Sequence, residues 1–269
     1  MQYGTSAKHN CLAFLGPVKK QECRRFEGII EYLKRSKIHY AISTDYAAYK
    51  NILQEFYQNA RVDVSTVPAT IRSTVQRKEV LITEDMIREI LRFGDDKDDP
   101  IVFDSILIRG GFLRMKYTGD VRAQEMLQKG CLPPEMKYLT HVVLKCLGPR
   151  RGTFDAIKDI LASAIVALTL NKPFNFSGMI MHHLKEVILR KPKENPFIVY
   201  PRFLQMILDN QIPNMVKRVE ELINIRRIDE VEMKRMLQYT NKPKSEYPPS
   251  RRLFAYLMRD NYVAPPGNR

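Results

Sequence analysis

Apolar side chains in the first sixty residues recur with the period of a helix. Residues 22–35 carry them at the i, i+3, i+4 and i+7 positions, starting from Phe26, which predicts an amphipathic helix. Residues 46–58 show the same spacing and predict a second helix. The short stretch between them, residues 38–43, is expected to be extended.

The period changes from helical to alternating after residue 60. Val62 and Val64 alternate with polar residues, and two further apolar stretches, 70–75 and 79–82, flank a polar link at 76–78. This alternation predicts a β-hairpin. The link lacks the Gly or Asn that tight hairpin turns favour.

A helix is predicted directly after the hairpin. Thr83 is placed to cap a helix over residues 84–91, whose first turn is acidic and suits the positive end of the helix dipole. Residues 94–100 are expected to form a solvated acidic loop. Residues 103–113 predict a short helix that ends near its glycine pair.

Helical periodicity dominates from residue 133 onward. Helices are expected at 136–147, 153–170, 178–189, from Pro201 onward, at 215–227 and at 230–239. The second of these is expected to be the longest, with Asn171 and Pro173 fixing its end. Ser177 is placed to cap the next one, and Asp229 with Glu232 has the spacing of a capping box.

These elements predict a mainly α fold with a small β-hairpin in the N-terminal half, which is an α+β class, and a helical C-terminal half. We divide the chain into an N-terminal α+β subdomain with the hairpin (10–113) and a helical subdomain (114–240). A basic, proline-rich tail follows (241–269), with a linker at 241–250 and one or two helical turns at 253–258.

Composition excludes a membrane span. The chain has 269 residues, of which 44% are hydrophobic, enough for a sizeable core. The longest apolar run, residues 160–170, is too short for a bilayer helix, which needs about 20 residues. The four cysteines match no zinc or redox spacing and indicate reduced thiols. We therefore expect no membrane partner and a cytoplasmic or nuclear location.

The chain is basic, with 44 Lys and Arg against 30 Asp and Glu and a net charge of +14. A basic surface attracts polyanions, of which nucleic acid is the commonest. Because phosphate contacts need only exposed cations, arginine pairs are candidate nucleic-acid-binding residues, with solvated surface as the alternative interpretation. The candidates are Arg150, Arg151, Arg226, Arg227, Arg251 and Arg252.

No pattern nominates a catalytic, metal or cofactor site. His182 and His183 are adjacent, whereas metal-binding pairs on a helix are spaced i, i+4. The acidic loop lacks the Gly and Glu that an EF-hand requires. Nucleotide-binding glycine motifs and the nucleophile signatures of hydrolases are absent from the sequence. We expect a protein that is not an enzyme and that uses no cofactor or metal.

Several segments, taken in order, resemble one family. The N-terminal half contributes residues 26–33, 38–42 and 71–91. The C-terminal half contributes KYLTHVVLKCL (137–147), ASAI (162–165), NKPFNFS (171–177) and YPRFLQMILD (200–209). They resemble plant retroelement-derived proteins abundant in daisy-family genomes. Those proteins look like the gag-like N-terminal part of copia-type retrotransposon polyproteins and like a plant transposon protein domain.

The resemblance implies a non-enzymatic capsid or packaging protein that self-associates and contacts nucleic acid, RNA rather than DNA, through basic surface. The sequence departs from the family pattern in lacking a C-x-x-C-x-x-x-x-H-x-x-x-x-C zinc knuckle. Two alternatives remain open, a transposase-like DNA-binding protein and a domesticated protein-interaction module.

Overall fold

A computed structural model describes residues 9–121, 127–149, 155–190 and 197–238. Within these ranges the protein is mostly helical with a few short antiparallel strands, which confirms the predicted fold class. The α-helices are α1 (Glu27–Arg35), α2 (His39–Ser43), α3 (Lys50–Asn59), α4 (Glu84–Leu91), α5 (Ser105–Arg114), α6 (Pro134–Val142), α7 (Asp159–Leu170), α8 (Phe176–Leu189), α9 (Pro201–Gln211) and α10 (Glu230–Gln238).

Short helical turns and strands complete the described chain. The turns are the 3-10 helices η1 (Gln21–Phe26), η2 (Lys129–Cys131) and η4 (Val219–Glu221) and the π-helical turn η3 (Val143–Leu147). The strands are β1 (Ala48–Tyr49), β2 (Arg61–Asp63), β3 (Thr70–Val75), β4 (Lys78–Ile82), β5 (Leu127–Gln128), β6 (Ala156–Ile157) and β7 (Leu222–Ile223).

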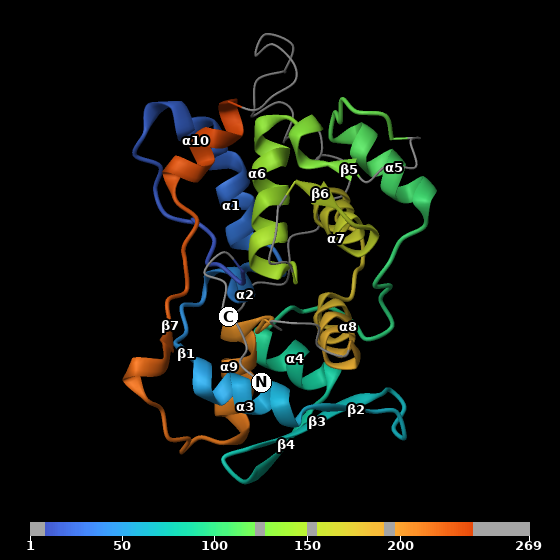
Figure 1. Ribbon diagram of the computed structural model, residues 1–269. Helices are drawn as coiled ribbons and strands as arrows, with labels where there is room; N and C mark the ends of the chain where they lie inside the picture. The colour runs from blue at the N-terminus through green and yellow to red at the C-terminus, as the bar shows by residue number, and fades with distance from the viewer. Residues whose placement is uncertain (1–8, 122–126, 150–154, 191–196, 239–269) are drawn as a thin grey trace.

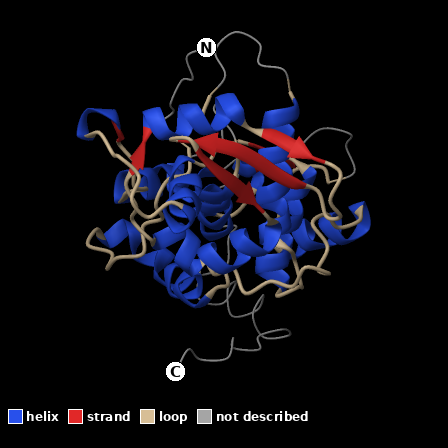
Figure 2. Cartoon of the chain, turned by 90° about the horizontal axis from the view of Figure 1, so that it is seen from below, coloured by secondary structure: helices blue, strands red, loops and turns tan. Residues whose placement is uncertain are grey.

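Helix α6 stands at the centre of the upper half of the molecule, with α1 and α10 on one side and α5 and α7 on the other (Figure 1). Helices α3, α4, α8 and α9 lie in the lower half, which is closed below by the sheet of β2, β3 and β4. Seen from below, this sheet lies across the helices behind it (Figure 2).

The predicted hairpin is confirmed as strands β3 and β4. Its turn places Gln76 and Arg77 at φ 48° and 64°, in the left-handed region that side chains other than Gly and Asn rarely adopt. Tertiary contacts hold this turn. The Gln76 amide donates to Glu55 Oε1 at 2.8 Å, and the Gln76 side chain bonds both backbone groups of Val216.

Three predicted helix starts are also confirmed. Thr83 caps α4 by accepting a hydrogen bond from the Met86 amide, and α9 opens on Pro201. Asp229 accepts a hydrogen bond from the Glu232 amide at 2.8 Å at the start of α10. The side chain of Glu232 does not complete a capping box, because it binds cations in the interior.

The predictions for residues 38–58 are wrong in part. Residues 39–43 form helix α2 rather than an extended segment. The helix places Ile42 one turn after its N-cap residue Ile38, and both side chains are buried in the core. The second predicted helix begins only at Lys50, because Ala48 and Tyr49 form strand β1 and pair with β7.

The helix predicted over residues 215–227 does not form. This segment contains η4 and β7 instead. Val216, Val219 and Leu222 are exposed, Val219 by 79%, so the apolar period of this segment does not correspond to a buried face.

The longest described helix is α8 with 14 residues, not α7 with 12. Helix α7 starts late because Ala156 and Ile157 form β6 and pair with β5. It ends as predicted at Asn171, which has a left-handed φ of 49°. The cap of α8 is Asn175 rather than Ser177, since Asn175 Oδ1 accepts from the Gly178 amide at 2.6 Å.

Helices α5 and α6 also differ from their predicted bounds. Helix α5 continues through Gly110 and Gly111 to Arg114, whereas the glycine pair was expected to end it. Helix α6 ends at Val142 and continues as the π-helical turn η3, which stops before Gly148 as expected.

Buried apolar residues from all parts of the described chain form one hydrophobic cluster, in which Ala164 is fully buried. The linker expected at 241–250 and the turns expected at 253–258 lie outside the described residues. The division into subdomains at residue 113 stays a prediction.

Candidate nucleic-acid interface

A basic surface forms where η1 packs beside α10, at the upper left of Figure 1. Three contacts fix this arrangement. Glu230 Oε1 accepts from the amides of Lys19 and Lys20, at 2.6 and 3.3 Å. Lys234 Nζ lies 3.0 Å from Glu22 Oε1. The chain segment before η1 is therefore pinned to the start of α10.

Four cations of this surface point to solvent without a carboxylate partner among the described residues. They are Lys19, Lys20, Arg24 and Arg235. Glu230 accepts from backbone amides and Glu22 pairs with Lys234, so neither carboxylate forms an ion pair with these four cations, although Glu22 is close enough to Lys20 to interact with its charge. We call Lys19, Lys20, Arg24, Lys234 and Arg235 the η1–α10 surface.

Arg25, the neighbour of Arg24, turns inward instead. Its Nε donates to Glu135 Oε1 at 2.7 Å, and the Glu135 side chain is only 3% exposed. Two adjacent arginines thus have different environments. Two cations that are adjacent in the sequence are therefore not always both available to bind phosphate.

The structure describes two of the six arginines nominated from the sequence, and both lie beside carboxylates. Arg226 lies 3.1 Å from the buried carboxylate of Glu232, and Arg227 lies 3.5 Å from the exposed Asp45. Both belong to the segment that leads into α10. The other four, Arg150, Arg151, Arg251 and Arg252, lie outside the described residues.

Glu232 is the centre of a buried polar cluster behind the η1–α10 surface. Its Oε1 accepts from Lys145 Nζ at 2.7 Å, and its Oε2 lies 3.5 Å from His141 Nε2. Lys129 Nζ lies 3.3 Å from His141 Nδ1 and 3.3 Å from Asp155. His141 of α6 and Lys145 of η3 therefore contact one carboxylate of α10, and Lys129 of η2 joins the cluster through His141.

The burial of this cluster changes its protonation. Burial alone would raise the pKa of Glu232, but hydrogen bonds from His141 and Lys145 outweigh it and lower the pKa to about 2. Burial lowers the pKa of His141 to about 4, and burial together with the nearby charge of Lys129 lowers the pKa of Lys137, one helical turn earlier, to about 8. At neutral pH Glu232 is thus a carboxylate and His141 is neutral.

The sequence contains a signal for this cluster that composition does not reveal. Lys137, His141 and Lys145 are spaced i, i+4, i+8, so they follow one face of the central helix. All three are buried, as are the other residues of α6. A polar stripe inside a buried helix predicts an internal polar network, because buried charges need partners.

A second internal network lies where the family-like segments meet. The Tyr200 hydroxyl donates to the Leu147 carbonyl and lies 2.8 Å from His183 Nδ1. The Tyr200 amide donates to His9 Nε2 at 2.7 Å. Burial lowers the pKa of both histidines to about 3, so both are neutral and serve as hydrogen-bonding side chains of the core.

Asn10 and Arg202 extend this network toward the N-terminus of the described chain. Asn10 Oδ1 accepts from the amides of Arg202 and Phe203, and its Nδ2 donates to the Cys146 carbonyl. The buried Arg202 guanidinium donates to the Thr44 carbonyl at 2.7 Å. Arg202 is therefore a structural cation that no nucleic acid can reach.

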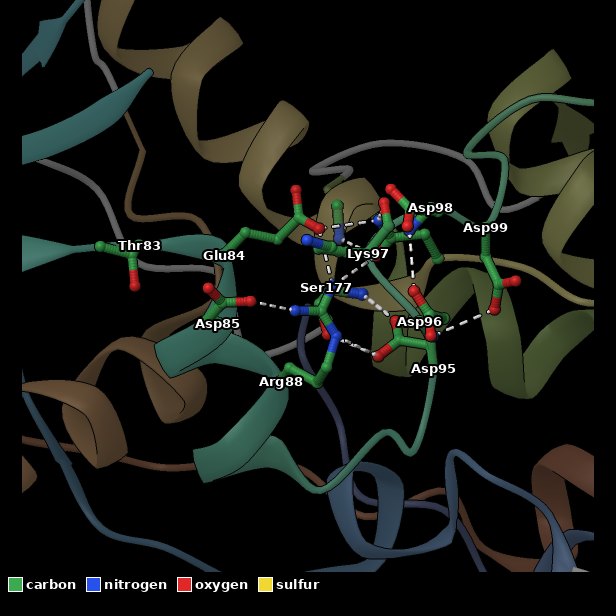
Figure 3. Close-up of polar contacts among 12 residues, drawn as sticks. Thr83, Glu84, Asp85, Arg88, Asp95, Asp96, Lys97, Asp98, Asp99 and Ser177 are labelled. Carbon is green, nitrogen blue, oxygen red and sulfur yellow. Dashed lines mark hydrogen bonds and ion pairs between the residues drawn. The ribbon is translucent and has the colours of Figure 1, made fainter. Parts of the chain in front are cut away.

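The acidic loop, residues 94–100, was expected to be solvated, and this is wrong for Asp95 (Figure 3). Its side chain is fully buried and accepts from the Ser177 amide, the Ser177 hydroxyl and Arg88 Nε. Burial raises the pKa of Asp95, although these hydrogen bonds oppose the shift. The loop is thereby tied to α4 and to the first turn of α8.

A small hollow of about 200 Å³ opens on the sheet of β2, β3 and β4. Arg61, Arg72 and Gln211 line it. Arg72 is paired with Asp63 at 2.7 Å, and Gln211 Oε1 accepts from the Leu81 amide. Its polar groups thus take part in contacts that hold the sheet.

Residues 9–121, 127–149, 155–190 and 197–238 contain no group of three or more His, Cys, Asp or Glu side chains arranged to hold a metal ion. None of their helices has the length and apolarity of a membrane span. The four cysteines are thiols, of which Cys131 is half-buried and the other three are buried.

Comparison with protein-family models, curated proteins and solved structures found no match to this chain. The fold and the surface chemistry therefore define it only as a mostly helical, basic α+β protein.

Proposed function

We propose that this protein is a non-enzymatic, retroelement-derived gag-like protein that self-associates and binds RNA through exposed cations. The observation that carries the proposal is the η1–α10 surface, where four cations lack a carboxylate partner within the described residues. The net charge of +14 and the resemblance of the family-like segments support it.

The phosphate backbone of RNA fits this surface because exposed, flexible cations need only a line of negative charge to bind. Lys19 and Lys20 precede η1, and Arg24 lies one turn further along it. The nominated arginines outside the described residues, Arg150, Arg151, Arg251 and Arg252, are included in the proposed RNA-binding set, as is the half-exposed Arg227.

The proposal assigns no catalytic role to the buried histidines. His9, His141 and His183 have pKa values lowered by burial to between about 3 and about 4. Each takes part in hydrogen bonds that join elements of the core. These contacts support a structural role for side chains that enzymes often use as acids or bases near neutral pH.

Fluorescence anisotropy of a labelled single-stranded RNA, titrated with the full chain at several salt concentrations, tests the proposal. We expect the logarithm of the affinity to fall linearly with the logarithm of the salt concentration. The double variant Lys19→Gln/Lys20→Gln should bind more weakly, and its salt slope should be shallower by about 0.7 for each phosphate that it no longer neutralises.

The matched control is Arg77→Gln/Lys78→Gln, which removes the same charge from the hairpin turn at the other end of the molecule (Figure 1). It should leave RNA affinity nearly unchanged. Salt-independent binding, or an equal loss in both double variants, would contradict the proposal. Tighter binding to duplex DNA than to RNA would favour the transposase-like alternative.

A further inference from the structure

Helix α5 is apolar on two opposite faces. Its inner face, with Ile108, Gly111 and Phe112, is buried against the core. Its outer face carries Ile106 and Leu113, which are 80% and 55% exposed. Arg109 and Arg114 keep the helix from being apolar all round, but a surface helix normally presents a polar face to solvent. The outer face of α5 is therefore the unusual feature, and we call Ile106, Gly110 and Leu113 the outer stripe.

The two adjacent glycines of α5 face opposite environments. A Cβ atom at Gly111 would lie 2.6 Å from Val166 of α7, so glycine there permits the close packing of two helices. A Cβ atom at Gly110 would meet nothing within 4 Å. Glycine inside a helix costs roughly 0.5–1 kcal/mol relative to alanine, and the described residues provide no packing that offsets this cost at Gly110.

We propose that the outer stripe is a self-association surface, on which the α5 helix of a second copy packs antiparallel about a two-fold axis beside Gly110. In this arrangement Ile106 of each copy lies against Leu113 of the other, so one apolar contact occurs twice, as a two-fold interface requires. Gly110 lets the two backbones approach at the crossing point, as Gly111 does toward α7 within one chain.

Charge selects the antiparallel orientation. The N-terminal end of α5 carries Asp104, whose carboxylate caps the helix, and the C-terminal end carries Arg114. Antiparallel packing places the acidic end of one helix beside the basic end of the other. Parallel packing would place like charges side by side and align the helix dipoles unfavourably.

The size of the stripe sets the strength of the contact. A helix of ten residues is about 15 Å long, so the pair buries less than the roughly 1,200–2,000 Å² of stable interfaces. The dimer is therefore weak and depends on protein concentration. This inference rests on the self-association in the proposed function and assigns that property to particular residues.

Sedimentation equilibrium of the full chain over a range of concentrations tests the surface. Wild type should show a monomer–dimer equilibrium. Ile106→Glu should weaken dimerisation by at least about tenfold, which corresponds to about 1.4 kcal/mol. Val67→Glu is the matched control, because Val67 is 99% exposed between β2 and β3, so that variant should dimerise like wild type.

Gly110→Ala separates dimerisation from folding. It should raise the melting temperature of the monomer, since alanine favours helix, while it weakens the dimer.

A wild type that stays monomeric at every concentration overturns the inference, as does an Ile106→Glu variant that dimerises normally. RNA binding by Ile106→Glu is measured in parallel. If RNA binding is intact while no α5 contact is found, only the proposed interface fails. If RNA binding also fails its salt test in wild type, the proposed function fails as well.

Discussion

Arg202 is the largest side chain that the described core buries completely. Burial lowers the pKa of its guanidinium to about 10, so it is still charged at neutral pH. It donates to the carbonyls of Thr44 and Cys11 rather than to a carboxylate. At the scale of single residues, this protein uses buried polar side chains to join distant backbone segments.

Small side chains in α7 have the opposite role, because they let neighbouring elements approach. Ala164 is fully buried, so Ala164→Leu should overpack the core and reduce the free energy of unfolding by about 1–3 kcal/mol. Thermal or urea denaturation measures this change. Ala47→Leu, at an exposed position, is the control and should be nearly neutral. An unchanged melting temperature for Ala164→Leu would contradict this account of the core.

At the scale of elements, α5 and α6 show that the polarity of a helix does not determine how much of it is buried. Helix α6 is buried on every side although it carries Glu135, Lys137 and His141. Helix α5 has no acidic residue yet exposes one apolar face. Internal partners such as Glu232 stabilise the charges of α6, whereas no described element covers the outer stripe of α5.

The link between α4, the acidic loop and α8 gives a second stability prediction. Asp95→Ala removes the acceptor of two Ser177 hydrogen bonds and a partner of Arg88. Leaving these buried groups unsatisfied should lower the free energy of unfolding by about 1–3 kcal/mol.

Asp98→Ala, in the same loop but exposed, provides the control. It should change stability by no more than about 0.5 kcal/mol. Equal effects of the two substitutions, measured by urea denaturation, would mean that Asp95 is solvated as the sequence alone suggested.

At the scale of the whole molecule, the first described residues connect parts that are distant in sequence. The amide of Cys11 donates to the Lys145 carbonyl, Leu12 bridges to Arg227, and the amide of Ala13 donates to the Ile42 carbonyl. Residues 9–13 therefore touch the ends of α2, of η3 and of the segment before α10. Loss of this segment would loosen several elements together.

Stability should fall in acid because three histidines are buried in neutral form. The unfolded chain binds protons on histidine near pH 6.5, but the folded pKa values are about 3 for His9 and His183 and about 4 for His141. The unfolded state thus holds more protons between pH 6.5 and 4. The contribution of the neutral histidines to the free energy of unfolding is fully present above pH 6.5 and is lost as the pH falls through this window.

The free energy of unfolding, plotted against pH, should have a slope of about 1.4 kcal/mol per pH unit for each histidine. Urea denaturation across this window measures it. His183→Gln should flatten the curve, whereas His182→Gln, half-exposed on the same helix, should leave the slope as in wild type. A stability that does not change between pH 6.5 and 4 would show that these histidines are solvated.

The sequence by itself determined the features that depend on local physics. The hairpin, the cap at Thr83, the proline at the start of α9 and the end of α7 at Asn171 all follow from side chains acting within a few residues. The mostly helical class follows from periodicity. The net charge of +14 also belongs to the sequence alone.

Only the tertiary structure decided which polar side chains face solvent. It separated exposed Arg24 from the partly buried Arg25 and the buried Arg202, placed Asp95 in the interior, and replaced a predicted helix at 215–227 with η4 and the strand β7. The physical reason is that burial depends on what packs opposite a residue. Partners such as Glu135 and Ser177 are more than eighty residues away, so no local pattern can reveal them.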